Sequence, residues 1–519
     1  MTSAVRLALA VTGGLLYAAA FPPVDLGWVA FVALVPLLLV TLDPSVTRGR
    51  TFLLGWLAGS VATSLLVTTS VATAATRYFE LGPTTAWLAG LAAPQLYGAP
   101  YFGVFALLAR AVARRSGGPV RSALAIAAAW VTCDLLRARL GDGCPWVLLA
   151  HSQHAHPTLL QVADLGGASL VAFVVALVNA AIALAITLTL SARRGNAPGR
   201  RAPLAALATV VTLIVGATLV YGRIQLARWS APPGASLRVA LVQGNLPDSW
   251  RYSLRDQPEA LRRMRDLTAQ TLAEQPDLVV WPENAISISP DASSSGFAAV
   301  TSAMPATARL LIGAPRAVQT APGRAALYNS ALLIDPRGDS TPAYDKLRLT
   351  AWAEGPPWPL GALPGLWPRV AGAYTPGQPI ALPEIRGHRF GVAICSEAIY
   401  AELIAAQVRR GATFLVNMAN DGWFGDRPAG AQHAAAVALR AVESRRFLVR
   451  VTSTGVSMVV APSGVVGATI PNASAGSLVA TVTPLDATTL YTRIGDVFAW
   501  LCVLAVAVTF VRPRRSAPA

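Results

Sequence analysis

The chain has 519 residues, of which 54% are hydrophobic and only 13% are charged, and its formal net charge is +16 at pH 7. A soluble globular protein carries roughly 25% charged residues, so this composition excludes an ordinary soluble domain and indicates a protein that lies largely in a membrane. The positive charge does not indicate nucleic-acid binding, because many arginines flank apolar segments, as they do on the inner face of membrane proteins.

Eight apolar stretches are long enough to span a bilayer. They lie at 5–21, 27–42, 52–74, 85–112, 121–140, 166–191, 203–222 and 493–511. We therefore expect a polytopic α-helical membrane bundle of about eight spans. It would consist of an N-terminal membrane domain over 1–222, with about seven transmembrane helices, and a C-terminal transmembrane helix with a basic cytoplasmic tail over 493–519.

Arginine is concentrated in alternate loops. The arginine-rich loops contain Arg48 and Arg50; Arg114, Arg115 and Arg121; Arg193, Arg194, Arg200 and Arg201; and, at the end of the chain, Arg512, Arg514 and Arg515. Positive residues favour the cytoplasmic side. This pattern predicts that both termini are cytoplasmic and that residues 223–492 are extracytoplasmic.

Residues 223–492 have the composition of a soluble domain. Buried strands are predicted at 237–243, 277–281, 309–313, 326–334, 389–394, 412–418 and 447–453. Helices are predicted at 258–274, 396–408 and 430–446. Strands that alternate with helices indicate an α/β domain.

Three residues capable of catalysis stand at the ends of predicted strands, where sites assemble in α/β folds. They are Glu283, Lys346 and Cys395. Cys395 lies between a strand and a helix, whose N-terminus favours a thiolate. Glu283 is a candidate base for the thiol, and Lys346 a candidate stabiliser of an oxyanion.

Each of these residues also has a simpler interpretation. Cys395 would then be an inert buried thiol, Glu283 a carboxylate at a helix start, and Lys346 a surface partner of Asp345. Lys346 is nevertheless the single lysine among 42 lysine and arginine residues. A retained ammonium suggests a tight site where arginine would not serve.

The cysteines and histidines indicate neither a disulfide framework nor a metal site. Four scattered cysteines are present, at Cys133, Cys144, Cys395 and Cys502. A disulfide between Cys144 and Cys395 would destroy the nucleophile and stays open as an alternative. The histidines at 151, 154 and 156 lack a ligand partner at metal-site spacing. We expect no cofactor and no metal.

Four motifs resemble the nitrilase superfamily. They are Trp281-Pro282-Glu283, Tyr344-Asp345-Lys346, Cys395-Ser396-Glu397, and the segment Asn417 to Gly425. With spans on both sides, the chain resembles the membrane-bound branch of that superfamily, the apolipoprotein N-acyltransferase family. Two departures stand out. Ser396 replaces the tyrosine that many members have after the nucleophile, and Ser453-Thr454-Gly455 replaces Asn-Thr-Gly.

The resemblance implies an extracytoplasmic nitrilase-like αββα sandwich over 223–492 with Glu283, Lys346 and Cys395 as its catalytic residues. It also implies supporting roles for Glu354, Glu397 and Asn420. The implied reaction moves a fatty acyl chain from a phospholipid, through a Cys395 thioester, to the α-amine of diacylglyceryl-cysteine in a bacterial lipoprotein. The partners would be a phospholipid donor, a diacylglyceryl-modified apolipoprotein and the bacterial cell membrane. The expected state is a monomer that binds no nucleic acid.

Aromatic residues near the motifs are candidates for lipid contact, because tryptophan favours membrane interfaces. The candidates are Trp250, Trp352, Trp423 and Phe424. The segment rich in proline and tryptophan between Glu354 and Tyr374 is either a lid that touches the membrane or an ordinary packed loop.

Two other functions remain open. A membrane-tethered nitrilase-type amidase would use the same three residues with water as acceptor, although a soluble amide substrate needs no bilayer. A transporter with an outer binding domain would need polar groups at mid-depth in the spans. The charged residues Asp134, Arg137 and Arg139 lie near one end of a span instead.

Overall fold

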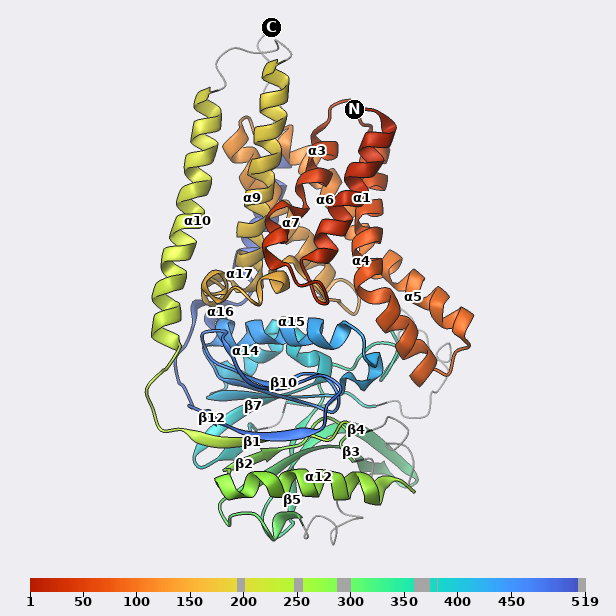
Figure 1. Ribbon diagram of the computed structural model, residues 1–519, viewed down its shortest axis with the longest axis vertical. Helices are drawn as coiled ribbons and strands as arrows, with labels where there is room; N and C mark the ends of the chain where they lie inside the picture. Colours follow the sequence, from red (N-terminus) through yellow and green to blue (C-terminus); the bar gives the residue numbers. More distant parts are fainter. Residues whose placement is uncertain (194–200, 247–254, 287–299, 359–373, 380, 512–519) are drawn as a thin grey trace. The chain divides into compact units, whose positions relative to one another are not determined.

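The computed structural model describes residues 1–193, 201–246, 255–286, 300–358, 374–379 and 381–511 (Figure 1). The chain forms two compact units, each described here by itself. The helical unit comprises Met1–Leu226, Arg427–Ala435 and the C-terminal part from Ile494. The sheet unit comprises Ala227–Asp426 and Ala436–Arg493.

The helical unit contains a helix for each of the eight predicted spans. Its elements are α1 (Ser3–Ala19), η1 (Gly27–Val29), α2 (Ala30–Ala33), α3 (Val35–Leu42), α4 (Arg48–Tyr78), α5 (Pro83–Tyr97), α6 (Ala99–Ala113), α7 (Pro119–Arg139), η2 (Leu149–Gln153), α8 (Pro157–Leu160), α9 (Ala163–Arg193), α10 (Arg201–Trp229) and α17 (Val497–Val511). Among the described residues, five helices are long and apolar enough to cross a membrane, and three apolar helices are shorter. The predicted membrane bundle is confirmed, with a helix count close to the expected eight.

Two predicted spans are not single straight helices. The stretch at 27–42 is divided into η1, α2 and α3, with Pro36 in the first turn of α3. The stretch at 85–112 is divided into α5 and α6 at Gly98, where the backbone leaves helical geometry (φ −127°, ψ −60°). Proline removes a helical N–H and clashes with the preceding turn, and both breaks lie next to prolines.

The helices of this unit pack through small residues. A Cβ added at Gly14 of α1 would lie 2.5 Å from the Ala58 carbonyl oxygen of α4. A Cβ added at Gly55 of α4 would lie 2.6 Å from the Phe102 carbonyl oxygen of α6. Close backbone approach through glycine is the common packing mode of transmembrane helices.

Over its described residues, the sheet unit contains two six-stranded sheets. The first has the order β12-β1-β2-β3-β4-β5, and the second has the order β11-β10-β9-β8-β7-β6. The strands are β1 (Leu237–Gln243), β2 (Leu278–Val280), β3 (Arg309–Ala321), β4 (Arg324–Ile334), β5 (Ser340–Asp345), β6 (Glu384–Ile385), β7 (His388–Ile394), β8 (Phe414–Ala419), β9 (Leu448–Thr452), β10 (Ser457–Val460), β11 (Val466–Ile470) and β12 (Gly476–Val482).

Helices cover the outer face of each sheet, so the expected αββα sandwich is confirmed (Figure 1). The helical elements of this part are α12 (Gln257–Thr271), η3 (Leu272–Glu274), η6 (Cys395–Ile399), α14 (Ala401–Arg409), η7 (Asp421–Phe424), α15 (Ala429–Ser444) and α16 (Leu490–Ile494). Strand β1 shows why the layers form. Its residues Val239 and Leu241 pack between the sheets, whereas Ala240 and Val242 pack under α12 with Met264. Such two-sided burial follows from alternation along a strand.

The pairing of the strands brings their ends together. Strands β1, β2 and β3 are parallel neighbours, and so are β7, β8 and β9. Strand β5 returns antiparallel to β4, with Ser330 opposite Asp345. The chain leaves β2 towards Glu283, leaves β5 at Lys346 and leaves β7 at Cys395.

Candidate active site

Glu283 and Lys346 form a buried ion pair. The Lys346 Nζ lies 3.4 Å from Glu283 Oε1 and 2.7 Å from Glu354 Oε2, and the Lys346 side chain is 1% exposed. Lys346 therefore does not pair with Asp345, which binds Arg316 at 2.5 Å instead. The interpretation of Lys346 as a surface residue is wrong.

Two carboxylates keep Lys346 charged. Burial opposes the charge, but Glu354 and then Glu283 raise the pKa of Lys346 well above its usual range. The same contact lowers the pKa of Glu354, against the effect of its burial. Lys346 is therefore a fixed cation at physiological pH and is suited to electrostatic stabilisation rather than to proton transfer.

Glu283 has one oxygen held and one oxygen available. Its Oε1 accepts a hydrogen bond from Asn329 Nδ2 at 2.8 Å. Its buried Oε2 has no hydrogen-bond partner within the part of the chain that the structure describes. Residues 283–286 form a turn rather than the start of a helix. An oriented carboxylate with one free oxygen is the geometry expected of a general base.

Asn329 of β4 is a site residue that the sequence reasoning missed. Its Nδ2 also donates to Glu354 Oε1 at 2.7 Å, and so it bridges the two glutamates. The backbone N–H of Thr350 donates to Glu354 Oε2 at 2.7 Å. A buried asparagine within a predicted strand was the available signal, since buried polar groups need partners. Glu354 thus contacts both Lys346 and Asn329; the supporting role that the family resemblance implies stays a prediction.

Cys395 occupies a strained corner after β7. Its φ is +55°, in the left-handed region that side chains other than glycine rarely adopt, and the residue is half-buried. Burial, and next the charge of Glu283, raise the pKa of the Cys395 thiol well above its usual range, although Lys346 opposes the shift. The expectation of a thiolate stabilised by a helix start is therefore wrong, because η6 is one short 3-10 turn beside carboxylates. A resting thiol needs a base during attack.

Glu397, two residues after Cys395, links several backbone segments of the site. Its Oε1 accepts hydrogen bonds from the N–H groups of Leu347 and Arg348, at 2.7 and 2.9 Å, and from the Tyr344 hydroxyl at 2.9 Å. Its Oε2 accepts from the Ile394 N–H at 2.9 Å. Burial raises the pKa of Glu397 to about 7, although Lys346 and these donors oppose the shift. One side chain therefore connects the end of β5 to the end of β7.

The other motif residues lie next to this cluster. Asn420 Oδ1 accepts from the Gly422 N–H at 3.0 Å and from Ser453 Oγ at 2.7 Å, so it shapes the turn after β8. Ser396, at the first departure from the family pattern, places its Oγ 3.0 Å from Thr350 Oγ1. Both serines at the departures thus make polar contacts at the site.

The predicted lipid contacts have mixed outcomes. Trp250 lies outside the described residues, as does the segment 359–373. Trp352 has a left-handed backbone (φ +71°) and a side chain that is 45% exposed, two residues from Glu354. Trp423 and Phe424 are half-buried in η7. The roles of these residues in lipid contact stay predictions.

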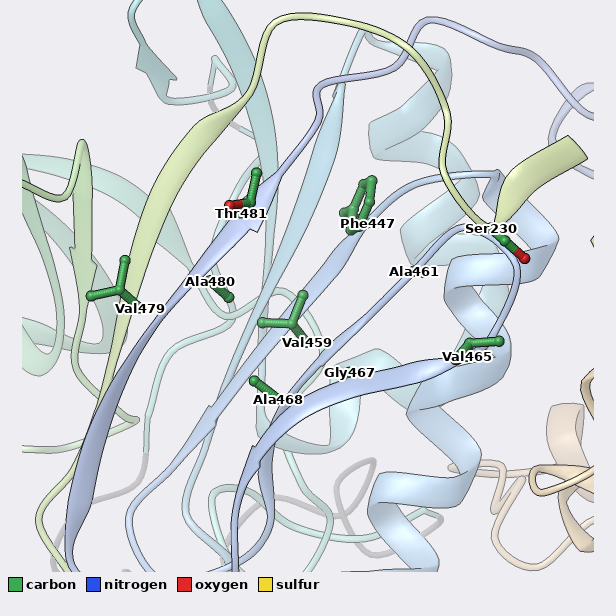
Figure 2. Close-up of a pocket in the computed structure, with 10 residues that line it drawn as sticks. All are labelled: Ser230, Phe447, Val459, Ala461, Val465, Gly467, Ala468, Val479, Ala480 and Thr481. Carbon is green, nitrogen blue, oxygen red and sulfur yellow. The ribbon is translucent and has the colours of Figure 1, made fainter. Parts of the chain in front are cut away.

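Three other features were candidates for a site: the remaining cysteines, a metal centre and a pocket. None of the four cysteines is in a disulfide, so the alternative of a bond between Cys144 and Cys395 is wrong. Over the described ranges, no group of three His, Cys, Asp or Glu side chains is placed to hold a metal ion. A pocket of about 420 Å³ lies between β12 and the β10–β11 hairpin, lined by residues such as Val459, Val479 and Phe447 (Figure 2). The described residues that line it are mostly apolar, with the hydroxyl groups of Ser230 and Thr481 among them.

Comparisons with known proteins match two families to this chain. Residues 13–181 match the family described as the apolipoprotein N-acyltransferase N-terminal domain, and residues 238–490 match the carbon-nitrogen hydrolase family.

Proteins of similar sequence cover nearly the whole chain. The apolipoprotein N-acyltransferase of Geobacter metallireducens is 31% identical over 96% of this chain and 94% of its own length. That of Methylococcus capsulatus is 30% identical over 98% of this chain and 96% of its own length. Among solved structures, an amidase from Nesterenkonia sp. is 19% identical, with a TM-score of 0.38 over 52% of this chain and 97% of the amidase. On the strength of the full-length relatives, the chain belongs to the apolipoprotein N-acyltransferase family.

Proposed function

We propose that this membrane protein transfers an acyl chain from a phospholipid to the N-terminal α-amine of a diacylglyceryl-modified lipoprotein, through a thioester on Cys395. Membership of the family supports the reaction. The observation that supports the residue roles is the buried cluster in which Lys346 contacts Glu283, and the charges of both act on the Cys395 thiol.

In the first half-reaction, the Cys395 sulfur attacks the ester carbonyl of the phospholipid. Glu283 takes the thiol proton through its free Oε2 as the C–S bond forms. Lys346 stabilises the negative charge on the carbonyl oxygen. The C–O bond then breaks, Glu283 returns the proton to the leaving alcohol, and a lysophospholipid departs.

In the second half-reaction, the lipoprotein amine attacks the thioester carbonyl. Glu283 takes a proton from the amine, Lys346 again faces the oxyanion, and the C–S bond breaks as the amide forms. The proton then passes to sulfur and restores the thiol. Division of the transfer into two steps lets one site serve two large substrates in turn.

The membrane helices have a physical reason in this reaction. Each methylene of an acyl chain contributes about 0.8 kcal/mol to retention in the bilayer, so neither substrate leaves the membrane readily. We infer that the sheet unit lies on the extracytoplasmic side, because every arginine-rich loop then lies in the cytoplasm. Trp352, Trp423 and Phe424 are the candidates for contact with acyl chains in the described part of the site.

A product assay separates this function from a tethered amidase. Purified protein is incubated with phospholipid vesicles and a synthetic diacylglyceryl-cysteine peptide, and products are identified by mass spectrometry. The acyltransferase predicts an N-acylated peptide and lysophospholipid in equal amounts. Hydrolysis to free fatty acid without an acylated peptide would indicate the amidase.

Two cysteine variants provide the controls. Cys395→Ala is expected to abolish both products, whereas Cys144→Ser, in a loop of the helical unit, is expected to retain them. A transporter predicts no products from the unmodified protein and no effect of Cys395→Ala on its transport.

A further inference from the structure

A buried polar network adjoins the backbone of Cys395. The Asn417 Nδ2 donates to the carbonyl oxygens of Ala393 and Cys395, at 3.0 and 3.2 Å. Asn417 is on β8, directly opposite Ala393 in the parallel register. The carbonyl of the strained residue itself is therefore held by a side chain from the neighbouring strand.

Arg450 fixes which way the Asn417 amide points. On β9, it stands opposite Asn417 and donates from Nη1 to Asn417 Oδ1. Arginine has only donors. A flipped amide would set its NH₂ against the guanidinium and its oxygen against two carbonyls, so only the observed orientation lets the Asn417 amide bond to all three of these partners.

Asp421 supplies the countercharge. Its Oδ2 accepts from Arg450 Nη2 at 2.6 Å. Asn417, Arg450 and Asp421 are each at most 1% exposed. A buried ion pair contributes little net stability compared with apolar residues of similar volume. Stability of the fold is therefore a weak reason for an arginine in the middle of β9.

The strained backbone at Cys395 needs contacts that hold it in place. A residue other than glycine is strained in the left-handed region, and such a conformation persists only where its surroundings over-determine it. Glu397 holds the N–H of Ile394 just before the corner, and Asn417 holds the carbonyl of Cys395. The two contacts fix the corner from both ends.

We propose that Asn417 and Arg450, with Asp421 as countercharge, are positioning residues that hold the Cys395 backbone in its strained conformation so that the sulfur meets the ester carbonyl. This inference rests on the proposed role of Cys395 as the nucleophile. Charged groups that act on the thiol are Glu283, Lys346, Asp421 and Glu354.

The test measures acylation of Cys395 by phospholipid in single-turnover experiments, across pH, in the full-length protein. Asn417→Asp keeps the shape and the acceptor for Arg450 but removes the donor to the two carbonyls. We expect its rate plateau at high pH to fall about tenfold to a hundredfold, because small misplacements of reacting atoms have effects of that size. The KM for phospholipid is expected to stay within about twofold.

Further variants separate positioning from charge and from folding. If Asn417→Asp acted only through its charge, the midpoint of the pH–rate profile would shift but the acylation rate at the high-pH plateau would not change. An unchanged plateau rate in this variant therefore overturns the proposal. Arg450→Lys keeps the charge but loses the two-pronged geometry, so we expect its plateau rate to fall less than that of Arg450→Met. Equal plateau rates in these two variants and the unmodified protein would also overturn the proposal. If Asn417→Asp does not fold, the comparison of Arg450→Lys with Arg450→Met tests the proposal instead.

Two controls complete the design. Asn472→Asp makes the same chemical change on a surface contact to Asp426 and is expected to leave the rate within about twofold. Failure of the unmodified protein to acylate at Cys395 contradicts the proposed function itself. Normal acylation by both the unmodified protein and Asn417→Asp contradicts only the positioning role.

Discussion

Lys346 lies between two carboxylates in a space that fits an ammonium. It reaches Glu354 at 2.7 Å and Glu283 at 3.4 Å with almost no exposed surface. The guanidinium of arginine is planar, larger and directional. A positive charge alone is therefore not enough at position 346, because the cation must also be small enough to fit.

We predict that Lys346→Arg and Lys346→Met both lose acylation. The loss should be about a hundredfold to a thousandfold, the usual effect of removing one oxyanion stabiliser. Arginine should fail because it displaces Glu283, and methionine because it leaves two buried carboxylates without a cation. Single-turnover acylation kinetics measure both. A Lys346→Arg variant within threefold of the normal rate would contradict the tight-site interpretation.

Glu397 predicts how stability changes with pH. Its pKa is raised to about 7 in the fold, above the ordinary value of 4.5. The folded protein therefore holds this proton more tightly than the unfolded chain, and the contribution of Glu397 to stability falls as pH rises from about 4.5 to 7. The full change is about 3 kcal/mol in the linkage relation.

Glu397→Gln tests that sign. Melting temperatures of the unmodified protein and the variant are compared at pH 5 and pH 8 in the same detergent. We expect the melting temperature of the unmodified protein to fall more between pH 5 and pH 8 than that of the variant, because glutamine does not titrate. Parallel changes in the two proteins would show that Glu397 does not carry the shift.

At the residue scale, the sequence draws attention to the candidate reacting groups more readily than to the side chains that hold them. Glu283 and Cys395 directly follow predicted strands, whereas Lys346 lies past one and stands out as the single lysine of the chain. Asn329, Asn417 and Arg450 lie inside strands, where sequence does not show which face a polar side chain occupies. Their roles depend on register between strands, which only the structure supplies.

Among the elements, β3 and the turn after β2 fit together closely. A Cβ added at Gly313 of β3 would lie 2.6 Å from the Glu283 Cα and 2.5 Å from the Pro282 carbonyl oxygen. The Gly313 carbonyl also accepts a hydrogen bond from the Ala285 N–H at 3.0 Å. This glycine therefore positions the candidate base through its backbone.

Gly313→Ala is predicted to push the Glu283 turn away from Lys346. Acylation should fall about tenfold to a hundredfold, with a lower melting temperature from the clash. Gly467→Ala in β11 is the matched control, because its added Cβ would meet only one atom, at an ordinary 3.5 Å. Equal activity of the two variants would show that the close approach at Gly313 has no functional role.

The elements found from sequence are those with continuous apolar runs. Strands β1, β2, β7, β8 and β9 are central and buried on both faces, so each reads as an apolar run. Edge strand β11 is mostly exposed and β12 is partly exposed. Without a buried run neither was predicted. The extension of β3 and the strand β5 also escaped notice, because their exposed halves are polar.

On the scale of the whole molecule, hydropathy predicts the membrane spans and arginine placement predicts their orientation. The eight apolar stretches each contain an apolar helix in the structure, because a bilayer requires internally satisfied backbone over its full thickness. Breaks such as the one at Gly98 were not predicted, since neighbouring helices can satisfy a broken backbone locally. Sidedness rests on charge alone.

Labelling of single introduced cysteines tests sidedness. Arg337→Cys is on an exposed loop of the sheet unit, and Arg50→Cys is at the exposed start of α4. In intact spheroplasts, a membrane-impermeant maleimide should label Arg337→Cys above the background of the parent protein but should label Arg50→Cys only after lysis. The reverse pattern would place the sheet unit in the cytoplasm.

The most direct test of the whole account is the intact mass of the protein after exposure to phospholipid alone. We expect an increase of one acyl chain, located on Cys395 by peptide mapping, and its loss when a diacylglyceryl-cysteine peptide with a free amine is added, with the acyl chain recovered as an amide. No increase in mass, or an acyl group on any residue other than Cys395, would contradict the account.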